Sequence, residues 1–152
     1  MTRRPSGFSL IELVIVLTII GTFSALAVPR FASASARFRA DAAAKRVAND
    51  LSLAATEARA ISQNVTISYN LPAARYELSG VQRLDKKAGN YAVDLAAEPY
   101  RASIVSANFG GTNAVTFNLY GVPSQSGTVV IKSGSVTKTI TYTASSGKAV
   151  VQ

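Results

Sequence analysis

An apolar run from Phe8 to Val28 constrains this 152-residue chain more than any other stretch of its sequence. The only ionisable side chain within the run is the carboxylate of Glu12. A short basic segment with Arg3 and Arg4 precedes the run, and Pro29 follows it. As a helix, such a run would rise about 31 Å, which is the thickness of the hydrocarbon core of a bilayer. The sequence therefore predicts a helix that spans a membrane.

Glu12 needs a reason to lie inside this run. A charged residue costs about 2.5 to 3.5 kcal/mol near the centre of a membrane span and less near its edge. The carboxylate could lie at the membrane boundary, within reach of the headgroups, or it could be a charge kept for a partner inside the membrane. The residues alone leave these two interpretations even.

Pro29 lacks a backbone N–H and clashes with the carbonyl four residues back, so we expect it to kink or end the membrane helix. Beyond it, apolar residues recur every three or four positions, which predicts an amphipathic helix from about Arg30 to Ser62. Together with the apolar run it would form one long helix, kinked at Pro29. The predicted apolar face consists of Phe31, Ala34, Phe38, Ala42, Ala44, Val47, Leu51, Ala55, Ala58 and Ile61.

After Ser62 the pattern changes to the alternation of β-strands. The residues between 84 and 89 predict a loop, as do those between 121 and 127, and residues 133–135 predict a hairpin turn. We expect Lys132 and Lys138, on the two strands of that hairpin, to face solvent and discourage edge pairing. The predicted strands are Val65–Tyr69, Arg75–Leu78, Tyr91–Leu95, Ser103–Val105, Ala114–Tyr120, Thr128–Lys132, Val136–Tyr142 and Lys148–Val151. The fold class is α+β, with a long N-terminal helix, half transmembrane and half amphipathic, packed on a mostly antiparallel sheet.

The composition excludes most catalytic chemistry. The chain has no cysteine and no histidine. Without them there are no disulfides, no Ser-His-Asp or Cys-His nucleophile systems and few ways to build a zinc site. No glycine-rich phosphate loop is present, because the segment 109–112 lacks the required spacing and lysine. We therefore expect neither enzyme activity nor a bound cofactor or metal.

The net charge of +8 favours acidic surfaces, anionic lipid headgroups or nucleic acid as partners. Removal of Arg3 and Arg4 from the 16 basic residues would leave 14 against 8 acidic ones, or +6. The basic residues are spread along the chain, which is typical of a solvated surface.

The N-terminal sequence admits two other interpretations. The small residues Ala25 and Ala27 are typical of an ordinary secretory cleavage site, but the length of the run and the Glu12 carboxylate argue against one. The basic residues Arg30, Arg37 and Arg39 behind the run outnumber those before it. By themselves they favour a cytoplasmic C-terminus.

The segment from Gly7 to Leu13, Gly-Phe-Ser-Leu-Ile-Glu-Leu, resembles the class III signal of type IV pilins and type II secretion pseudopilins. The resemblance implies a leader of residues 1–7, cleavage between Gly7 and Phe8 by prepilin peptidase, and N-methylation of Phe8. It also implies that Glu12 pairs with the N-terminal amine of a neighbouring subunit, an attraction that a low dielectric strengthens. Residues 8–29 would then be a transmembrane and assembly helix in the bacterial inner membrane, and residues 30–152 a periplasmic pilin-like domain. This orientation is opposite to the cytoplasmic C-terminus that the basic residues behind the run favour.

The C-terminal third resembles the GspH/FimT branch of this family. The resemblance lies in Val115-Thr116-Phe117, Gly121 and the strands that follow, although Lys148 stands where arginine is usual. It leaves about Val81 to Asn113 unmatched. The absence of acidic residues after Glu98 argues against a major pseudopilin, which would be expected to carry an acidic calcium loop there.

The resemblance implies a minor pseudopilin of a type II secretion system, in a filament with other pseudopilins. The alternative is a FimT/FimU-like minor pilin of a type IV pilus, which could bind DNA during uptake. The positive charge favours that alternative modestly. The C-terminal residues Ala149 to Gln152 lack the basic cluster that such a role suggests.

Overall fold

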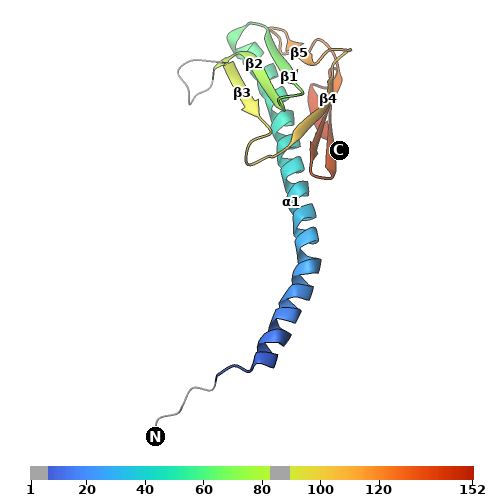
Figure 1. The fold of residues 1–152 in the computed structure, drawn as a ribbon. Coiled ribbons are helices and arrows are strands. Elements are labelled where there is room, and N and C mark those ends of the chain that lie inside the picture. Colours follow the sequence, from blue (N-terminus) through green and yellow to red (C-terminus); the bar gives the residue numbers. More distant parts are fainter. Residues whose placement is uncertain (1–6, 83–89) are drawn as a thin grey trace. The chain divides into compact units, whose positions relative to one another are not determined.

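The computed structural model describes residues 7–82 and 90–152 of the chain (Figure 1). They belong to two compact units, Met1–Ser35 and Ala36–Gln152. Helix α1, Leu10–Ile61, begins in the first unit and ends in the second. All strands of the described part of the chain belong to the second unit.

Helix α1 continues through Pro29 without interruption, so this proline does not end it. The predicted kink at Pro29 stays a prediction. At the other end, Ser62 adopts the left-handed conformation with φ of 54°, and the Gln63 amide donates to the Ala58 carbonyl at 3.2 Å. This is a Schellman-type cap, which satisfies a carbonyl of the last turn. The predicted end near Ser62 is therefore confirmed within one residue.

The face of α1 that packs in the second unit consists mostly of alanine. Val47 and Leu51 are its larger side chains, and both are fully buried. The alanines on this face are Ala40, Ala43, Ala44, Ala54, Ala55 and Ala58. Small side chains let strands approach the helix closely, because little volume separates the two backbones.

Two aromatic residues predicted on the apolar face do not lie on it. Phe31 is 78% exposed in the first unit, and Phe38 is 77% exposed in the second. The prediction was wrong for Phe38 because the buried stripe runs through Ala40 and Ala43. Phe38 lies roughly 200° around the helix from Ala40. Ala42, also predicted there, is exposed.

The eight strands form two antiparallel sheets of four strands each. The first sheet, sheet A, has the order β3-β2-β1-β5, and the second, sheet B, has the order β4-β6-β7-β8. Sheet A consists of β1 (Val65–Asn70), β2 (Arg75–Gln82), β3 (Asn90–Asp94) and β5 (Ala114–Phe117). Sheet B consists of β4 (Ser103–Asn108), β6 (Gly127–Ser133), β7 (Val136–Thr143) and β8 (Lys148–Val151).

The antiparallel pairing predicted from the sequence is confirmed, but the single predicted sheet is in fact two. All six strand pairs are antiparallel. The predicted hairpin of β6 and β7 is present, with Ser133 opposite Val136. The predicted strand Ala114–Tyr120 ends earlier, at Phe117. The predicted loop at residues 84–89 lies outside the described residues.

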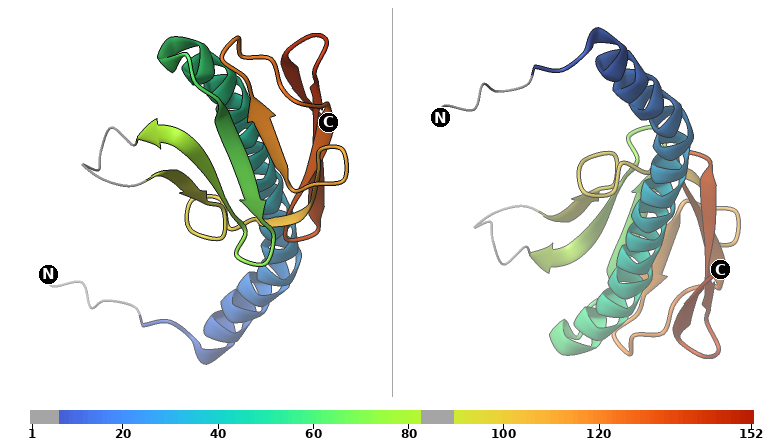
Figure 2. Two further views of the ribbon diagram at one scale, coloured as in Figure 1. Left: turned by 90° about the horizontal axis from the view of Figure 1, so that it is seen from above. Right: turned by 90° about the horizontal axis from the view of Figure 1, so that it is seen from below.

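Both sheets lie beside α1 (Figure 2). Side chains of the helix and of both sheets form one hydrophobic core. It contains Leu51 from the helix, Ile67 and Leu78 from sheet A, and Ile131 and Ile140 from sheet B. The residues between β5 and β6 carry the chain from sheet A to sheet B. This segment was predicted as a simple loop from residue 121 onward.

Candidate functional site

The N-terminal part of α1 presents apolar side chains that nothing in its own unit buries. Leu10 is 80% exposed, Ile11 67% and Phe23 70%. An 18-residue stretch of α1 near the N-terminus is long and apolar enough to cross a membrane, and none of it is buried. Exposed apolar area of this kind marks contact with lipid or with other proteins.

Glu12 lies in the first turn of α1, where the Leu13 amide donates to the Ser9 carbonyl at 3.1 Å. A carboxylate in the first turn of a helix interacts favourably with the positive end of the helix dipole. The Glu12 side chain is exposed. Within residues 7–82 and 90–152 it has no hydrogen-bond or ion-pair partner.

The bond between Gly7 and Phe8 lies just before the helix, in a stretch without regular structure. A Cβ atom added at Gly7 would meet nothing within 4 Å, and Gly7 is not among the glycines with positive φ. Neither space nor backbone conformation therefore requires glycine at this position. A reason for glycine must come from outside the folded chain.

In the second unit, Asp50 on α1 lies at the centre of a buried polar cluster. Its side chain is 4% exposed and accepts a hydrogen bond from the Tyr76 hydroxyl at 2.5 Å. Arg46 Nε lies 3.1 Å from Asp50 Oδ2, and the Tyr91 hydroxyl donates to Asp50 Oδ1 at 3.2 Å. Arg46 also donates to the Tyr91 hydroxyl. The Asp50 cluster (Arg46, Asp50, Tyr76 and Tyr91) thus fastens α1 to β2 and β3.

Electrostatics in the Asp50 cluster favour the neutral tyrosines. Burial, followed by the nearby Asp50 carboxylate, raises the pKa of Tyr76 and of Tyr91 above its usual range. Burial by itself lowers the pKa of Arg46, but the charge of Asp50, the two tyrosines and the hydrogen bond to Asp50 together outweigh it, and the net direction is upward. The cluster is therefore one charged pair that is hydrogen-bonded to two neutral tyrosines. This arrangement stabilises the packing of α1 on the strands, and neither tyrosine releases its proton near neutral pH.

Residues 118–123, the apolar loop, form a second notable feature of this unit. The Asn118 side chain accepts hydrogen bonds from the Tyr120 and Val122 amides, each at 3.0 Å. A Cβ atom at Gly121, whose φ is 71°, would lie 2.4 Å from the Ala55 carbonyl oxygen. The loop thus packs closely against α1. Leu119 is 43% exposed, Tyr120 71% and Val122 51%.

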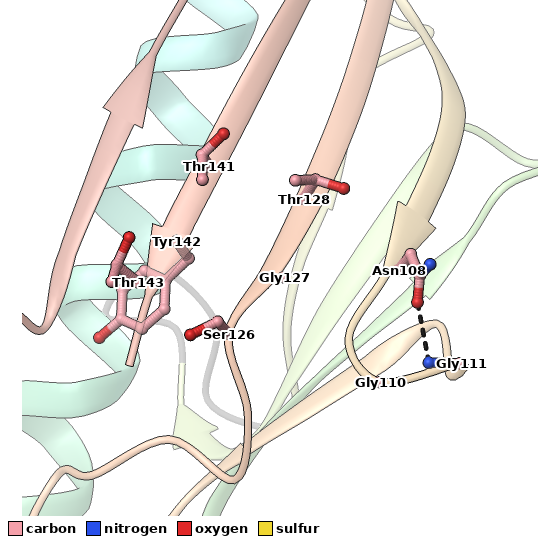
Figure 3. Close-up of a pocket in the computed structure, with 9 residues that line it drawn as sticks. All are labelled: Asn108, Gly110, Gly111, Ser126, Gly127, Thr128, Thr141, Tyr142 and Thr143. Atoms are coloured by element: carbon pink, nitrogen blue, oxygen red, sulfur yellow. Dashed lines mark hydrogen bonds between the residues drawn. The ribbon is translucent and has the colours of Figure 1, made fainter. Parts of the chain in front are cut away.

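A shallow depression of about 490 Å³ lies beside sheet B. Figure 3 shows the residues that line it. Its lining residues are uncharged, and most of the surface that they present is apolar. They include Asn108, whose side chain accepts a hydrogen bond from the Gly111 amide at 2.8 Å. The remaining lining residues are Gly110, Ser126, Gly127, Thr128, Thr141, Tyr142 and Thr143. No three His, Cys, Asp or Glu side chains gather at a potential metal site in the described part of the chain.

Two family models match the sequence. The model of the prokaryotic N-terminal methylation motif matches residues 2–28, and that of the type II transport protein GspH matches residues 43–147, more than half of the chain. The chain belongs to the GspH family. The GspH match also covers Val81 to Asn113, the middle segment for which the sequence motifs showed no resemblance.

Solved structures share the fold of this GspH family member. The type IV minor pilin FimU of Pseudomonas aeruginosa is 15% identical with a TM-score of 0.56, covering 76% of this chain and 90% of FimU. The minor pseudopilin EpsH from the type 2 secretion system of Vibrio cholerae is 14% identical with a TM-score of 0.56, covering 75% and 96%. No curated protein matches the chain. At such identities the likeness confirms the pilin-like fold.

Among the residues predicted to function, Gly7, Phe8, Glu12 and Pro29 all belong to the first unit. Their predicted roles in processing, assembly and kinking stay predictions. The Asp50 cluster and the apolar loop were not predicted as features. Arg46 and Asp50 stand four residues apart on one helix, a spacing typical of a surface ion pair. Nothing in the sequence showed that tyrosines of two distant strands cover them.

Proposed function

We propose that this GspH family member is a minor pseudopilin, a structural subunit of the periplasmic pseudopilus of a type II secretion system. Residues 1–7 act as the leader, residues 8–29 as the inner-membrane and assembly helix, and residues 30–152 as the periplasmic domain. Prepilin peptidase cuts between Gly7 and Phe8, and Phe8 is N-methylated. The observation that supports this most is an exposed apolar helix with a lone carboxylate, joined to a domain of the GspH family.

Glu12 has the assembly role in this proposal. Its carboxylate has no partner among the described residues and lies five positions into the processed chain. The new amine of a neighbouring Phe8 supplies the opposite charge. In hydrocarbon, each of these charges is costly alone and favourable as a pair, so the pair selects one register between two helices.

The apolar loop supplies a contact for another subunit or for cargo. Aromatic residues such as Tyr120 are typical anchors at protein interfaces. Arg59, also exposed, lies beside Gly121 at the foot of the loop. An arginine next to an exposed aromatic group is the composition that interfaces favour.

Membership of a type IV pilus is the second candidate. It is favoured by the equal likeness to the minor pilin FimU, with the same TM-score as EpsH. Deletion of the gene in its source organism separates the two machines. Loss of protein secretion with intact pili would support the pseudopilus, and loss of pili with intact secretion would support the pilus.

Mass spectrometry of the membrane-extracted chain tests the processing step. We expect a chain that begins at Phe8 and carries one additional methyl group. Gly7→Val should block cleavage completely, because the peptidase reads the glycine while the structure leaves space for a side chain there. Gly21→Ala, a glycine change inside the helix that also meets open space, is the matched control and should be processed normally. A mature chain that begins at Val28, or one that is never cut, would overturn the proposal.

Filament incorporation tests the role of Glu12. Glu12→Ala should be processed and inserted normally, but its content in sheared filaments should fall at least tenfold, since the charge pair is lost. Normal incorporation of this variant would contradict the pairing role.

A further inference from the structure

We propose that the domain carries an anionic-lipid docking surface at the end where it joins the membrane helix. The surface, here the basic collar, consists of Arg37, Arg39, Arg101 and Lys132. Its ligand is the phosphate headgroup layer of the bilayer that holds the chain. The inference rests on the proposed function in one respect, namely that residues 8–29 are anchored in a membrane.

The collar residues come together from three segments of the second unit. Arg101 and Lys132 line one depression of about 460 Å³, together with Gly134 of the β6–β7 turn. A Cβ atom at Gly134 would lie 3.1 Å from the Ala36 Cβ, so this turn packs on the first residues of the unit. Arg37 follows Ala36 directly, and Arg39 lies within the same turn of α1 but roughly 200° around the helix from Arg37, so the two arginines extend the collar on different sides of α1.

Nearby carboxylates neutralise only part of the positive charge at this end of the domain. Asp41 lies 3.4 Å from Lys45 Nζ and 3.3 Å from Lys138 Nζ, so two lysines face one carboxylate. Glu98 pairs with Arg101 at 2.6 Å. The carboxylate of Asp94 accepts hydrogen bonds from the amides of residues 96 and 97. Six basic residues (Arg37, Arg39, Lys45, Arg101, Lys132 and Lys138) therefore stand against three acidic ones among the described residues.

The covalent chain keeps the collar close to headgroups. Residues 29–35 separate the end of the apolar run at Val28 from the start of the second unit at Ala36, and they are helical. A helix rises about 12 Å between residues 28 and 36. The headgroup region extends roughly 5 to 8 Å beyond the hydrocarbon core, and the Debye length at physiological salt is about 8 Å. A connecting segment this short allows the collar to come within the electrostatic range of lipid phosphates.

Effective concentration favours lipid over nucleic acid as the partner. A tethered surface meets the headgroups at a concentration set by the short connecting segment, whereas DNA must arrive from solution. The headgroup layer of an anionic membrane attracts nearby Lys and Arg residues. The collar would hold the domain against the bilayer until the subunit is drawn into the filament.

The experiment uses the full chain in bilayer nanodiscs. Because the chain has no cysteine, Ser135→Cys places one fluorophore on the exposed β6–β7 turn, and Ser145→Cys places one on the exposed turn between β7 and β8. A headgroup-attached nitroxide lipid quenches a fluorophore that lies near the membrane. We expect stronger quenching at position 135 in phosphatidylglycerol–phosphatidylcholine discs than in phosphatidylcholine discs, and no such difference at position 145.

Two charge-matched double variants isolate the collar. Arg101→Gln with Lys132→Gln removes one arginine and one lysine from it, and should lower the ratio of docked to undocked domain roughly 30-fold. Arg59→Gln with Lys148→Gln removes the same charge elsewhere and should leave the ratio unchanged. Lys148 pairs with Thr143, at the other end of β7 from the collar turn. Circular dichroism confirms that each variant is folded.

Each result decides for or against the collar. Equal quenching in both kinds of disc, or an equal response of both double variants, would overturn the inference. If the collar variant loses affinity for a DNA duplex while its response to lipid is normal, the surface belongs to nucleic acid and the lipid assignment is wrong. A chain that fails to enter the discs contradicts the proposed function instead, so the two failures are distinguishable.

Discussion

The two units of this chain use apolar residues in opposite ways. In the first unit, the side chains of Phe8, Leu10 and Phe23 are at least 70% exposed. In the second unit, those of Leu51, Ile67 and Phe117 are fully buried. The second unit buries its own core, whereas the first needs lipid or neighbouring helices to remove its apolar area from water. A residue in the first unit therefore acts mainly on partners, and one in the second mainly on folding.

The two notable carboxylates offer the strongest test of this contrast. Asp50→Ala leaves Arg46 and the Tyr76 hydroxyl without their partner, and should lower the free energy of unfolding by about 3 kcal/mol, because a broken buried pair leaves polar groups unsatisfied. This value stands at the low end of the usual range, because the Arg46 side chain is 40% exposed. Urea denaturation of the detergent-solubilised chain measures it.

Glu12→Ala is the matched control in the first unit. It should change the free energy of unfolding of the domain by less than about 0.5 kcal/mol, because an exposed side chain with no partner in the described part of the chain contributes little. Similar losses for both variants would show that the two units do not differ in the way proposed.

A pair of glycines gives a smaller but sharper test. Gly121→Ala forces a side chain at a φ of 71° and within 2.4 Å of a backbone oxygen, so we expect a loss of about 2 kcal/mol. Gly21→Ala meets open space inside the helix and should stabilise it by up to about 1 kcal/mol. Thermal unfolding followed by circular dichroism compares them, and a destabilising Gly21→Ala would indicate a close neighbour at that position.

Loss of stability at alkaline pH is expected from a group in the second unit, the buried Tyr76. Because burial and Asp50 raise the pKa of Tyr76 above its unfolded value of 10.0, its neutral form is favoured in the folded state. This stability is fully present below pH 10 and is lost as the pH rises above it. Between pH 8 and pH 10.5 the wild type should lose about 1 kcal/mol more than Tyr76→Phe, as linkage requires. Denaturation curves at the two pH values measure the difference, and parallel losses would contradict it.

The sequence predicted those features that depend on local pattern. The length of the apolar run predicted a helix, and the alternation from Val65 onward predicted most strands to within a few residues. Features that depend on distant contacts were missed. The pairing of β5 with β1 and of β4 with β6 separates two sheets, and no local signal distinguishes them from one.

The errors in the candidate sites have the same origin. Lys138 was expected to face solvent, yet its Nζ lies 3.3 Å from Asp41 on α1. Leu119 and Tyr120 fitted a strand by alternation, but Asn118 turns the backbone into a loop that exposes both. For Lys138 a partner far away in the sequence decided where the side chain lies. The loop at Asn118 is also held by a distant contact, because Gly121 packs against the Ala55 carbonyl of α1.

The order of strands in the two sheets has a consequence for how such subunits diversify. Strand β4 precedes β5 in the sequence but belongs to the other sheet, together with β6. Any single recombination point between β3 and β6 therefore separates at least one strand from its pairing partner. Neither sheet can be exchanged between related genes as one intact cassette. The strand order leaves exchange of the whole domain, substitutions, and insertions in the connecting loops as ways to change the surface of such a subunit.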